Sequence, residues 1–219
     1  MTYRFAEIRR GTTIQLVDAD HKAIFKRIDG HLVKQYQAIV LHELDLRFCQ
    51  SCLCELKSLD YNRQSERAEA YWISCVTRFF KCFGESKARA KLSASKIFKP
   101  DAGSTADFEY FRALRNKHIV HDENSFSDVL VAVAVNASEQ EPPFVEVFAS
   151  PIHLFTIEGD LERLGNLVKK ALEWIAERRS QLEEALTATY IQWTRERLLA
   201  LPDLTAAGPS QNDVFLTRK

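Results

Sequence analysis

The sequence predicts a mainly α protein, a bundle of long helices with one small β-hairpin. Apolar residues recur at spacings of three and four along most of the 219 residues, the period of an amphipathic helix. Only seven glycines and six prolines interrupt this pattern, so few turns are expected. Between residues 128 and 149 the pattern changes to alternation, which predicts two antiparallel strands.

Composition excludes several classes of protein. Thirty acidic and thirty basic residues give a formal net charge of zero, so no strong overall attraction to nucleic acid is indicated, although a local basic cleft remains possible. Residues 1–6 lack the continuous apolar core of a secretory signal, and no apolar run approaches the ~20 residues that span a bilayer. Five cysteines without an export signal favour reduced thiols. We expect a cytoplasmic protein without membrane contact.

The first part of the chain is predicted to be extended and then helical. Residues 3–17 mix threonines with basic and apolar residues and suit an extended arm or a short strand. The carboxylate of Asp18 or Asp20 can cap the first helix. The apolar spacing then predicts helices over residues 19–28, 31–59, 64–83 and 86–98.

The next helix combines an apolar face with polar residues that do not suit it. Ser104 and Asp107 resemble a capping box that starts this helix. Its apolar face is formed by Phe108, Phe111, Leu114 and Ile119. Arg115 and His118 fall within the same face, and His121 lies just beyond its edge. A guanidinium and an imidazole on an apolar face lose hydration, so they require hydrogen-bonding partners or a cleft.

The predicted β-hairpin covers residues 128–149. Valines at positions 129, 131, 133 and 135 alternate mostly with smaller residues, as in a strand. Pro142 and Pro143 interrupt the pattern within a long polar loop, and residues 144–148 form the second strand. The hairpin is thus an insertion that follows the helix with Arg115.

A long helix is predicted over residues 160–201. At 1.5 Å per residue it would be roughly 60 Å long, more than a compact domain of this size needs. Either it breaks near residues 178–180, or its far end packs on a partner subunit. Residues 205–219 suit a flexible tail. We expect one domain over residues 1–204.

The cysteines do not predict a metal site. Cys49, Cys52 and Cys54 lie in a predicted helix, where Cys52 and Cys54 point in very different directions. A tetrahedral site would need a loop there and a fourth ligand. We therefore expect thiols of the core or surface, and neither a metal nor another cofactor.

A basic run has two interpretations. Lys87, Arg89, Lys91 and Lys96 form either a solvated face or a surface that contacts RNA phosphates and displaces their counterions. Lys117, which lies between Arg115 and His118 in the sequence, joins this set if the protein binds RNA.

The segment Arg115-Asn-Lys-His-Ile-Val-His121 resembles the signature of the HEPN superfamily, the higher eukaryote and prokaryote nucleotide-binding domains. Its members are small helical bundles that carry Arg, four to six residues and then His, often with Asn, Asp or His after the Arg. Asn116 occupies that favoured position. Arg112 and His118 also satisfy the spacing, but Asn116 favours the register of Arg115 with His121. The segment looks especially like HEPN proteins of bacterial abortive-infection and toxin–antitoxin systems.

This resemblance implies a metal-independent endoribonuclease. The 2′-hydroxyl of RNA would attack the adjacent phosphate and leave a 2′,3′-cyclic phosphate and a 5′-hydroxyl end. His121 would be the general acid or base, because histidine titrates near neutrality. Arg115 would bind phosphate and stabilise the charge that develops on it. Asn116 would orient the histidine or a phosphate oxygen, and His118 is a candidate second acid or base.

The resemblance also implies partners. Members of the family usually form dimers in which two motif helices share one cleft, so we expect a two-fold homodimer with a composite site. RNA would be the substrate, in phage defence or as a toxin, and an antitoxin or regulatory protein is a further expected partner. Two alternatives stay open. One is a non-catalytic HEPN-like module that binds RNA, a nucleotide or a protein, and the other is a structural helical oligomer.

Overall fold

The computed structural model describes residues 5–10, 13–18, 23–60, 63–121, 127–137, 144–153 and 159–207. These residues are mainly helical with a small antiparallel hairpin, so the predicted fold class is confirmed. Backbone contacts divide the chain into two compact units. Unit 1 comprises residues 1–42, 85–91 and 175–219, and unit 2 comprises residues 43–84 and 92–174. The single domain over residues 1–204 stays a prediction.

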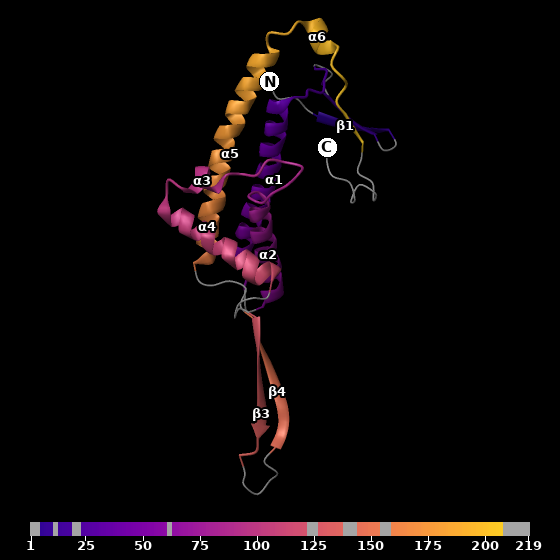
Figure 1. The fold of residues 1–219 in the computed structure, drawn as a ribbon. Coiled ribbons are helices and arrows are strands. Elements are labelled where there is room, and N and C mark those ends of the chain that lie inside the picture. Colours follow the sequence, from indigo (N-terminus) through magenta and orange to yellow (C-terminus); the bar gives the residue numbers. More distant parts are fainter. Residues whose placement is uncertain are drawn as a thin grey trace. The chain divides into compact units, whose positions relative to one another are not determined.

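Figure 1 labels most of the elements, which follow one another in a simple order. The helices are α1 (His31–Ser58), α2 (Ser65–Lys81), α3 (Ala94–Phe98), α4 (Ala102–Leu114), the π-helix η1 (Arg115–Val120), α5 (Asp160–Tyr190) and α6 (Arg195–Leu199). The strands are β1 (Phe5–Arg10), β2 (Thr13–Asp18), β3 (Ser127–Val135), β4 (Phe144–His153) and β5 (Thr205–Ala207). Among the described helices, none is both long enough and apolar enough to span a bilayer.

Unit 2 is organised around aromatic side chains. Phe79 of α2 is fully buried, and its ring centroid lies 6.2 Å from that of Phe108 in α4 and 6.5 Å from that of Phe98 in α3. Trp72, two turns earlier on α2, packs edge-on against Phe111. The buried positions of α2 recur every three or four residues, as its sequence predicts. These contacts place α4, which leads directly into η1, against α2.

Unit 1 contains a three-stranded antiparallel sheet in the order β1-β2-β5. Strand β5 lies inside the predicted flexible tail, where it pairs with residues 13–15 of β2. Residues 208–219 of that tail lie outside the described residues. The β-strand option for the N-terminal stretch is confirmed, because β1 and β2 pair over their full lengths.

The predicted helix over residues 19–28 is wrong. Residues 23–29 have no helical turn, and residues 19–22 lie outside the described residues. The backbone N–H of Arg27 donates to the carbonyl of Pro202 at 2.8 Å, and Lys26 forms a β-bridge with Asp203. Pairing with a segment far away in the sequence therefore replaces the local helical hydrogen bonds that the apolar spacing suggested.

The predicted helix over residues 86–98 is helical only at α3. Nε2 of buried His42 donates to the carbonyl of Ala90 at 2.8 Å, and the N–H of Leu92 donates to the carbonyl of Cys82. These partners use backbone groups that a continuous helix would need. The side chain of Ser93 then caps α3 by accepting from the N–H of Lys96.

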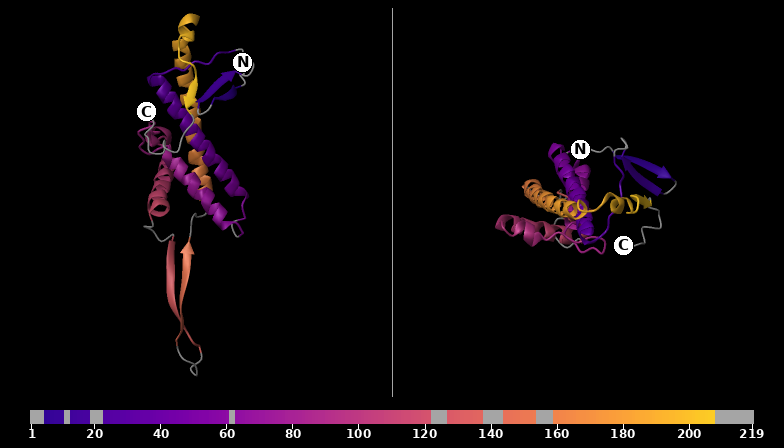
Figure 2. Two further views of the ribbon diagram at one scale, coloured as in Figure 1. Left: turned by 90° about the vertical axis from the view of Figure 1, so that its right-hand side faces the viewer. Right: turned by 90° about the horizontal axis from the view of Figure 1, so that it is seen from above.

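Of the two alternatives for the long C-terminal helix, a break near residues 178–180 is wrong. Helix α5 continues through these residues and ends at Tyr190, so the helix predicted to reach residue 201 is shorter. A turn follows, and the hydroxyl of Thr194 caps the separate helix α6. Figure 2 shows the two helices in further views.

The aromatic contacts predict a large stability loss when Phe79 is replaced. Phe79→Ala should lower the free energy of unfolding by about 3–5 kcal/mol, because it removes a buried ring and leaves a cavity. Ile73, on the same helix but 37% exposed, provides the control, and Ile73→Ala should cost about 1 kcal/mol or less. Urea unfolding followed by circular dichroism measures both. Equal losses would contradict the assignment of Phe79 to the centre of the core.

Candidate functional site

Helix α4 begins at a different cap from the one predicted. The carboxylate of Asp101 accepts from the N–H of Gly103 at 3.0 Å and from the hydroxyl of Ser104 at 2.7 Å. Ser104 is therefore inside the helix, and the capping box of Ser104 with Asp107 is wrong. Asp101 takes the role because its extended backbone precedes the first helical residue.

Polar contacts hold α4 against the first turn of α5. Arg163 donates to Asp107 at 2.8 Å and to Asp160 at 3.2 Å, and its guanidinium lies 4.3 Å from the centroid of the Tyr110 ring. The Tyr110 hydroxyl also donates to Asp160, at 3.1 Å. Burial and the Asp160 carboxylate raise the pKa of Tyr110 to about 12, so its hydroxyl remains a donor. Together these bonds fix the helix that leads into the motif.

The motif itself forms a π-helix. The sequence predicts an α-helix through this segment, but α4 ends at Leu114 and η1 covers Arg115–Val120. The hydrogen bonds of a π-helix join residues five apart, and such wide turns frequently occur at functional sites. His121 ends the turn with an extended backbone, at φ −131° and ψ 146°.

The side chains of the motif divide between the protein interior and solvent. The predicted apolar residues Phe108, Phe111 and Leu114 are buried. Arg115 and His118 are half-buried, as their place on the apolar face suggested. Asn116, Lys117 and His121 are exposed. The intermediate position of Arg115 and His118 agrees with the predicted conflict between polar groups and an apolar face.

Arg115 has an unusual set of contacts. Its Nη1 donates to the side-chain oxygen of Asn116 at 2.8 Å. Its Nε is buried and has no hydrogen-bond partner among the described residues. In the same part of the chain no carboxylate pairs with this guanidinium, whereas Arg112, one turn earlier, is paired with Glu109. A desolvated guanidinium nitrogen without an acceptor is costly, so an anion would stabilise this site.

The predicted RNA-binding residues belong to two units. Lys117 and Lys96 are in unit 2 and exposed, whereas Lys87, Arg89 and Lys91 are in unit 1. Lys91 is exposed and forms an ion pair with Glu85.

Lys87 and Arg89 line a pocket of about 320 Å³ at the start of α1. The other lining residues are His31, Lys34, Gln35, Ser86, Ala88 and Ala90. All lining residues are basic or neutral, and the N-terminus of a long helix adds positive potential, so the pocket suits an anion. His31 and Lys34 were not among the predicted binding residues, although their spacing of three at a helix start places both in the first turn.

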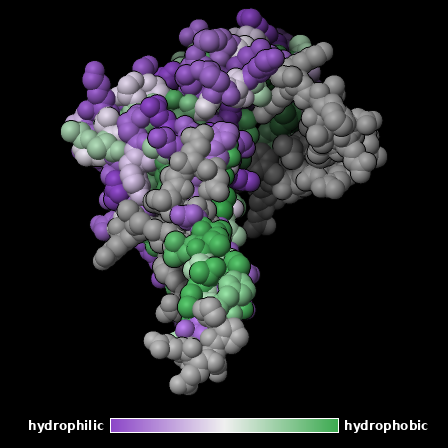
Figure 3. Space-filling model, turned by 60° about the horizontal axis from the view of Figure 1, so that its bottom comes forward, coloured by the Kyte–Doolittle hydropathy of each residue, from purple (hydrophilic) through white to green (hydrophobic). Residues whose placement is uncertain are grey.

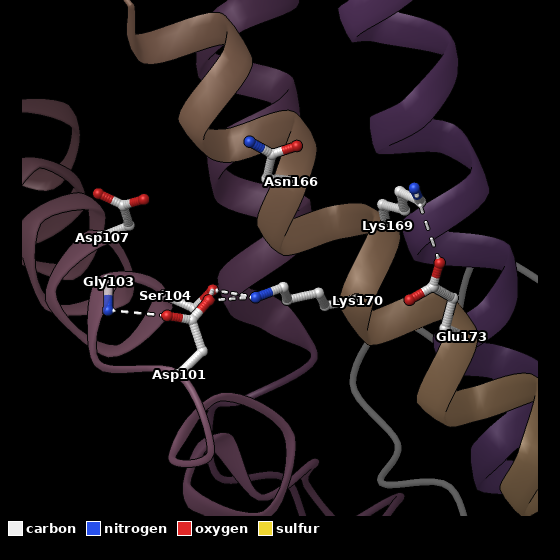
Figure 4. A pocket seen from close by; sticks show the side chains of 8 residues that line it. All are labelled: Asp101, Gly103, Ser104, Asp107, Asn166, Lys169, Lys170 and Glu173. Carbon is white, nitrogen blue, oxygen red and sulfur yellow. Dashed lines mark hydrogen bonds and ion pairs between the residues drawn. The ribbon is translucent and has the colours of Figure 1, made fainter.

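A second pocket, of about 290 Å³, lies between α4 and α5 (Figure 4). Lys170 pairs with Asp101 and donates to Ser104 at 2.7 Å, and Lys169 pairs with Glu173 at 3.9 Å. The charges of this pocket are thus bound to one another, which indicates a structural role. Hydrogen bonds from Lys170 and Ser104 hold the pKa of Asp101 well below its usual range.

This pKa shift predicts an acid-sensitive helix start. A carboxyl whose folded pKa is lowered contributes stability above its unfolded pKa of about 3.9 and loses it as the pH falls through the folded value. The wild type should therefore lose more stability between pH 6 and pH 3 than Asp101→Asn, in which this group no longer titrates. Urea midpoints across this pH range measure the difference. Identical pH dependence in the two proteins would contradict the predicted contribution of Asp101.

The cysteines are distributed as core and surface thiols. Cys49, Cys52, Cys75 and Cys82 are buried, and Cys54 is exposed. Burial raises the pKa of Cys52 to about 11, and Cys49 and Cys75 each donate to the other's backbone carbonyl. In the described ranges, no three His, Cys, Asp or Glu side chains come together as a metal site.

The exposure of the thiols predicts their reactivity. At pH 8 an aromatic disulfide reagent should label Cys54 rapidly and the four buried thiols slowly, because only an accessible thiolate attacks the reagent. Absorbance should show one fast thiol per chain, and all five after denaturation in urea. Cys54→Ser should abolish the fast phase. Rapid labelling of Cys52 would contradict the packing of α1 on α2.

Comparison of the chain with protein-family models, with curated proteins and with solved structures found no match. The functional assignment therefore comes from the chain's own residues. The π-helix of Arg115–Val120 with its terminal His121 is the strongest candidate, and the basic pocket at the start of α1 is the second.

Proposed function

We propose that this chain is a HEPN-type endoribonuclease that cleaves RNA without a metal ion. The observation that carries the proposal is the Arg115 guanidinium, which is half-buried, bound to Asn116 and without a carboxylate partner among the described residues. The same segment supplies two histidines. Guanidinium, amide and imidazole groups are the chemistry that phosphodiester transfer to the 2′-hydroxyl requires.

Arg115 would bind the scissile phosphate. Its planar guanidinium can donate two parallel hydrogen bonds to phosphate oxygens. The bond from Nη1 to Asn116 restricts its orientation. As the phosphate passes to a five-coordinate transition state with additional negative charge, these donors would bind it more strongly than they bind the substrate.

The histidines would transfer the protons. His121 is exposed at the end of η1, where a substrate can reach its ring from solvent. One imidazole would take the proton of the 2′-hydroxyl, and a protonated imidazole would give one to the departing 5′-oxygen. This balance requires two histidines, which His121 and His118 of one chain, or His121 of two chains, would supply.

A homodimer with two motif helices at one cleft would complete this site, as the resemblance to the HEPN family implies. The half-buried Arg115 and His118 support this part of the proposal, because a second copy would exclude water from groups that are already partly desolvated. The resemblance also implies a role in phage defence or as a toxin, restrained by an antitoxin or regulatory protein.

A non-catalytic binding module is the second candidate, and the basic pocket at the start of α1 favours it. His31, Lys34, Lys87 and Arg89 can hold a phosphate group without any reaction. In an active enzyme the same residues would contact the RNA backbone away from the scissile bond. Removing them should then weaken RNA binding and its salt dependence without abolishing turnover.

The proposal predicts loss of cleavage in two variants. His121→Ala and Arg115→Ala should each reduce the rate of RNA cleavage in EDTA at least a hundredfold, because one removes an acid or base and the other a phosphate ligand. Arg112→Ala provides a matched control, since Arg112 is exposed, paired with Glu109 and only one turn away. Gel analysis of 5′-labelled RNA measures the rate and identifies the 2′,3′-cyclic phosphate.

The outcomes separate the two candidates. Unimpaired cleavage by both variants would place the reaction elsewhere in the chain. Loss of cleavage in Arg112→Ala, but not in Arg115→Ala, would assign the site to the alternative register with His118. RNA binding by the wild type without any cleavage would favour the binding module.

A further inference from the structure

The β-hairpin exposes an exceptional number of large apolar side chains. Nine of them, at 51–68% exposure, are Val129, Leu130, Val131, Val133, Val135, Phe144, Val145, Val147 and Phe148. Figure 3 shows apolar side chains gathered over this region. Single exposed apolar residues are ordinary on a protein surface, but a contiguous set of this size marks an interaction site.

The strand register separates two faces of the hairpin. Val131 lies opposite Ala149, and Val133 lies opposite Val147. With Val129 and Pro151, which are also opposite each other, they form what we term the valine face. The other face includes Leu130 and Phe148 but also the polar residues Asp128, Glu146 and Ser150. Within these three pairs the valine face therefore has no charged group and no hydrogen-bonding side chain.

Such a hairpin is poorly stabilised by itself. A two-stranded ribbon is marginal in water unless a face is packed against another element. Here the side chains of both strands remain exposed along the hairpin. Hydrophobic burial by a partner would stabilise the paired strands and remove this apolar area from water.

The charges of the hairpin decide which kind of partner fits. Residues 127–153 contain no Lys or Arg, whereas Asp128, Glu139, Glu141 and Glu146 are acidic. RNA and anionic lipid surfaces attract basic residues, so this segment is unsuited to both. An uncharged face flanked by acidic residues instead suits an apolar protein surface of the same shape.

A second copy of this chain provides that surface. The acidic residues Asp128 and Glu146 lie on the other face of the hairpin, so they do not oppose each other when two valine faces meet. An interface between identical chains with two-fold symmetry joins the same patch on both copies, and the valine face can pack on itself because it has no charge to repel. Flat β-branched side chains also suit the packing of sheet on sheet.

We infer that the hairpin β3–β4 is a dimerisation arm, and that the valine faces of two copies pack against each other. Leu130 and Phe148 lie on the other face and remain outside this interface. The inference is independent of the proposed ribonuclease activity, because it involves neither Arg115 nor a histidine. It also differs from a dimer held by the motif helices alone.

Sedimentation velocity over a dilution series tests the inference. The wild type should be a dimer, and Val131→Lys/Val133→Lys should weaken dimerisation at least a hundredfold, because two lysines would be buried without partners. Ala132→Lys/Ala134→Lys adds the same charges to the same strand but on the other face, and it should remain dimeric. Far-UV circular dichroism must show native helix content in both variants.

A second measurement uses the unmodified protein. Hydrogen exchange of the amides in residues 129–133 and 145–149 should slow as the concentration rises through the dimer midpoint. A wild type that is monomeric throughout, or exchange that does not change with concentration, would overturn the inference. A monomer that binds neutral lipid vesicles through the hairpin would overturn it as well and assign the face to lipid.

The variants also separate this inference from the proposed function. If Val131→Lys/Val133→Lys stays dimeric, the arm is refuted while the composite ribonuclease site stands. His121→Ala should retain the dimer even though it abolishes cleavage. Equal dissociation of both lysine variants would show that the valine face is not specific, and would refute the arm.

Discussion

Arg163 of α5 joins the two helices on which the candidate site depends. Its guanidinium pairs with Asp107 of α4 and with the fully buried Asp160 at the start of its own helix, and it stacks on Tyr110. A buried carboxylate is tolerated only when charge and hydrogen bonds compensate its lost hydration, so these groups hold one geometry. That geometry fixes the direction of α4 and therefore the position at which the π-helix begins. The polar contacts of Arg163 and the aromatic packing of α4 on α2 together position the motif.

The parts of the fold that could be predicted from the sequence are those held by contacts between residues close together in the chain. The apolar periodicity correctly identified α2 and α4, whose buried positions recur every three or four residues, and the hairpin, whose valines recur at every second residue. The loop before α3 was missed because its conformation depends on a hydrogen bond from His42, on the distant helix α1, to the carbonyl of Ala90. The same holds for residues 23–29, which pair with the segment around Pro202. Neither contact leaves a local signal.

The candidate site divides in the same way. Arg115 and Asn116 are neighbours in sequence, so their contact could be anticipated, as could the half-buried state of Arg115 and His118 on an apolar face. The π-helix could not, because side chains of ordinary helical propensity give no indication of a wider turn. His31 and Lys34 were missed because they are distant in sequence from Lys87 and Arg89, with which they share a pocket. In this chain, the spacing of residues in the sequence identified candidate functional groups, and tertiary contacts determined which of these groups lie close together.

Because this segment forms a π-helix, the number of residues between Arg115 and His121 affects its structure. Its turns contain more residues than those of an α-helix, so removing one residue between Arg115 and His121 would let an ordinary turn form. A π-turn holds one more residue than an α-turn over the same rotation, so the chain on either side of such a deletion would keep its direction. Only the side chains inside the turn would change their positions around the helix axis, and these include His118. The extra residue of the π-turn thus determines how His118 is presented relative to Arg115, in addition to the chemistry of the two side chains.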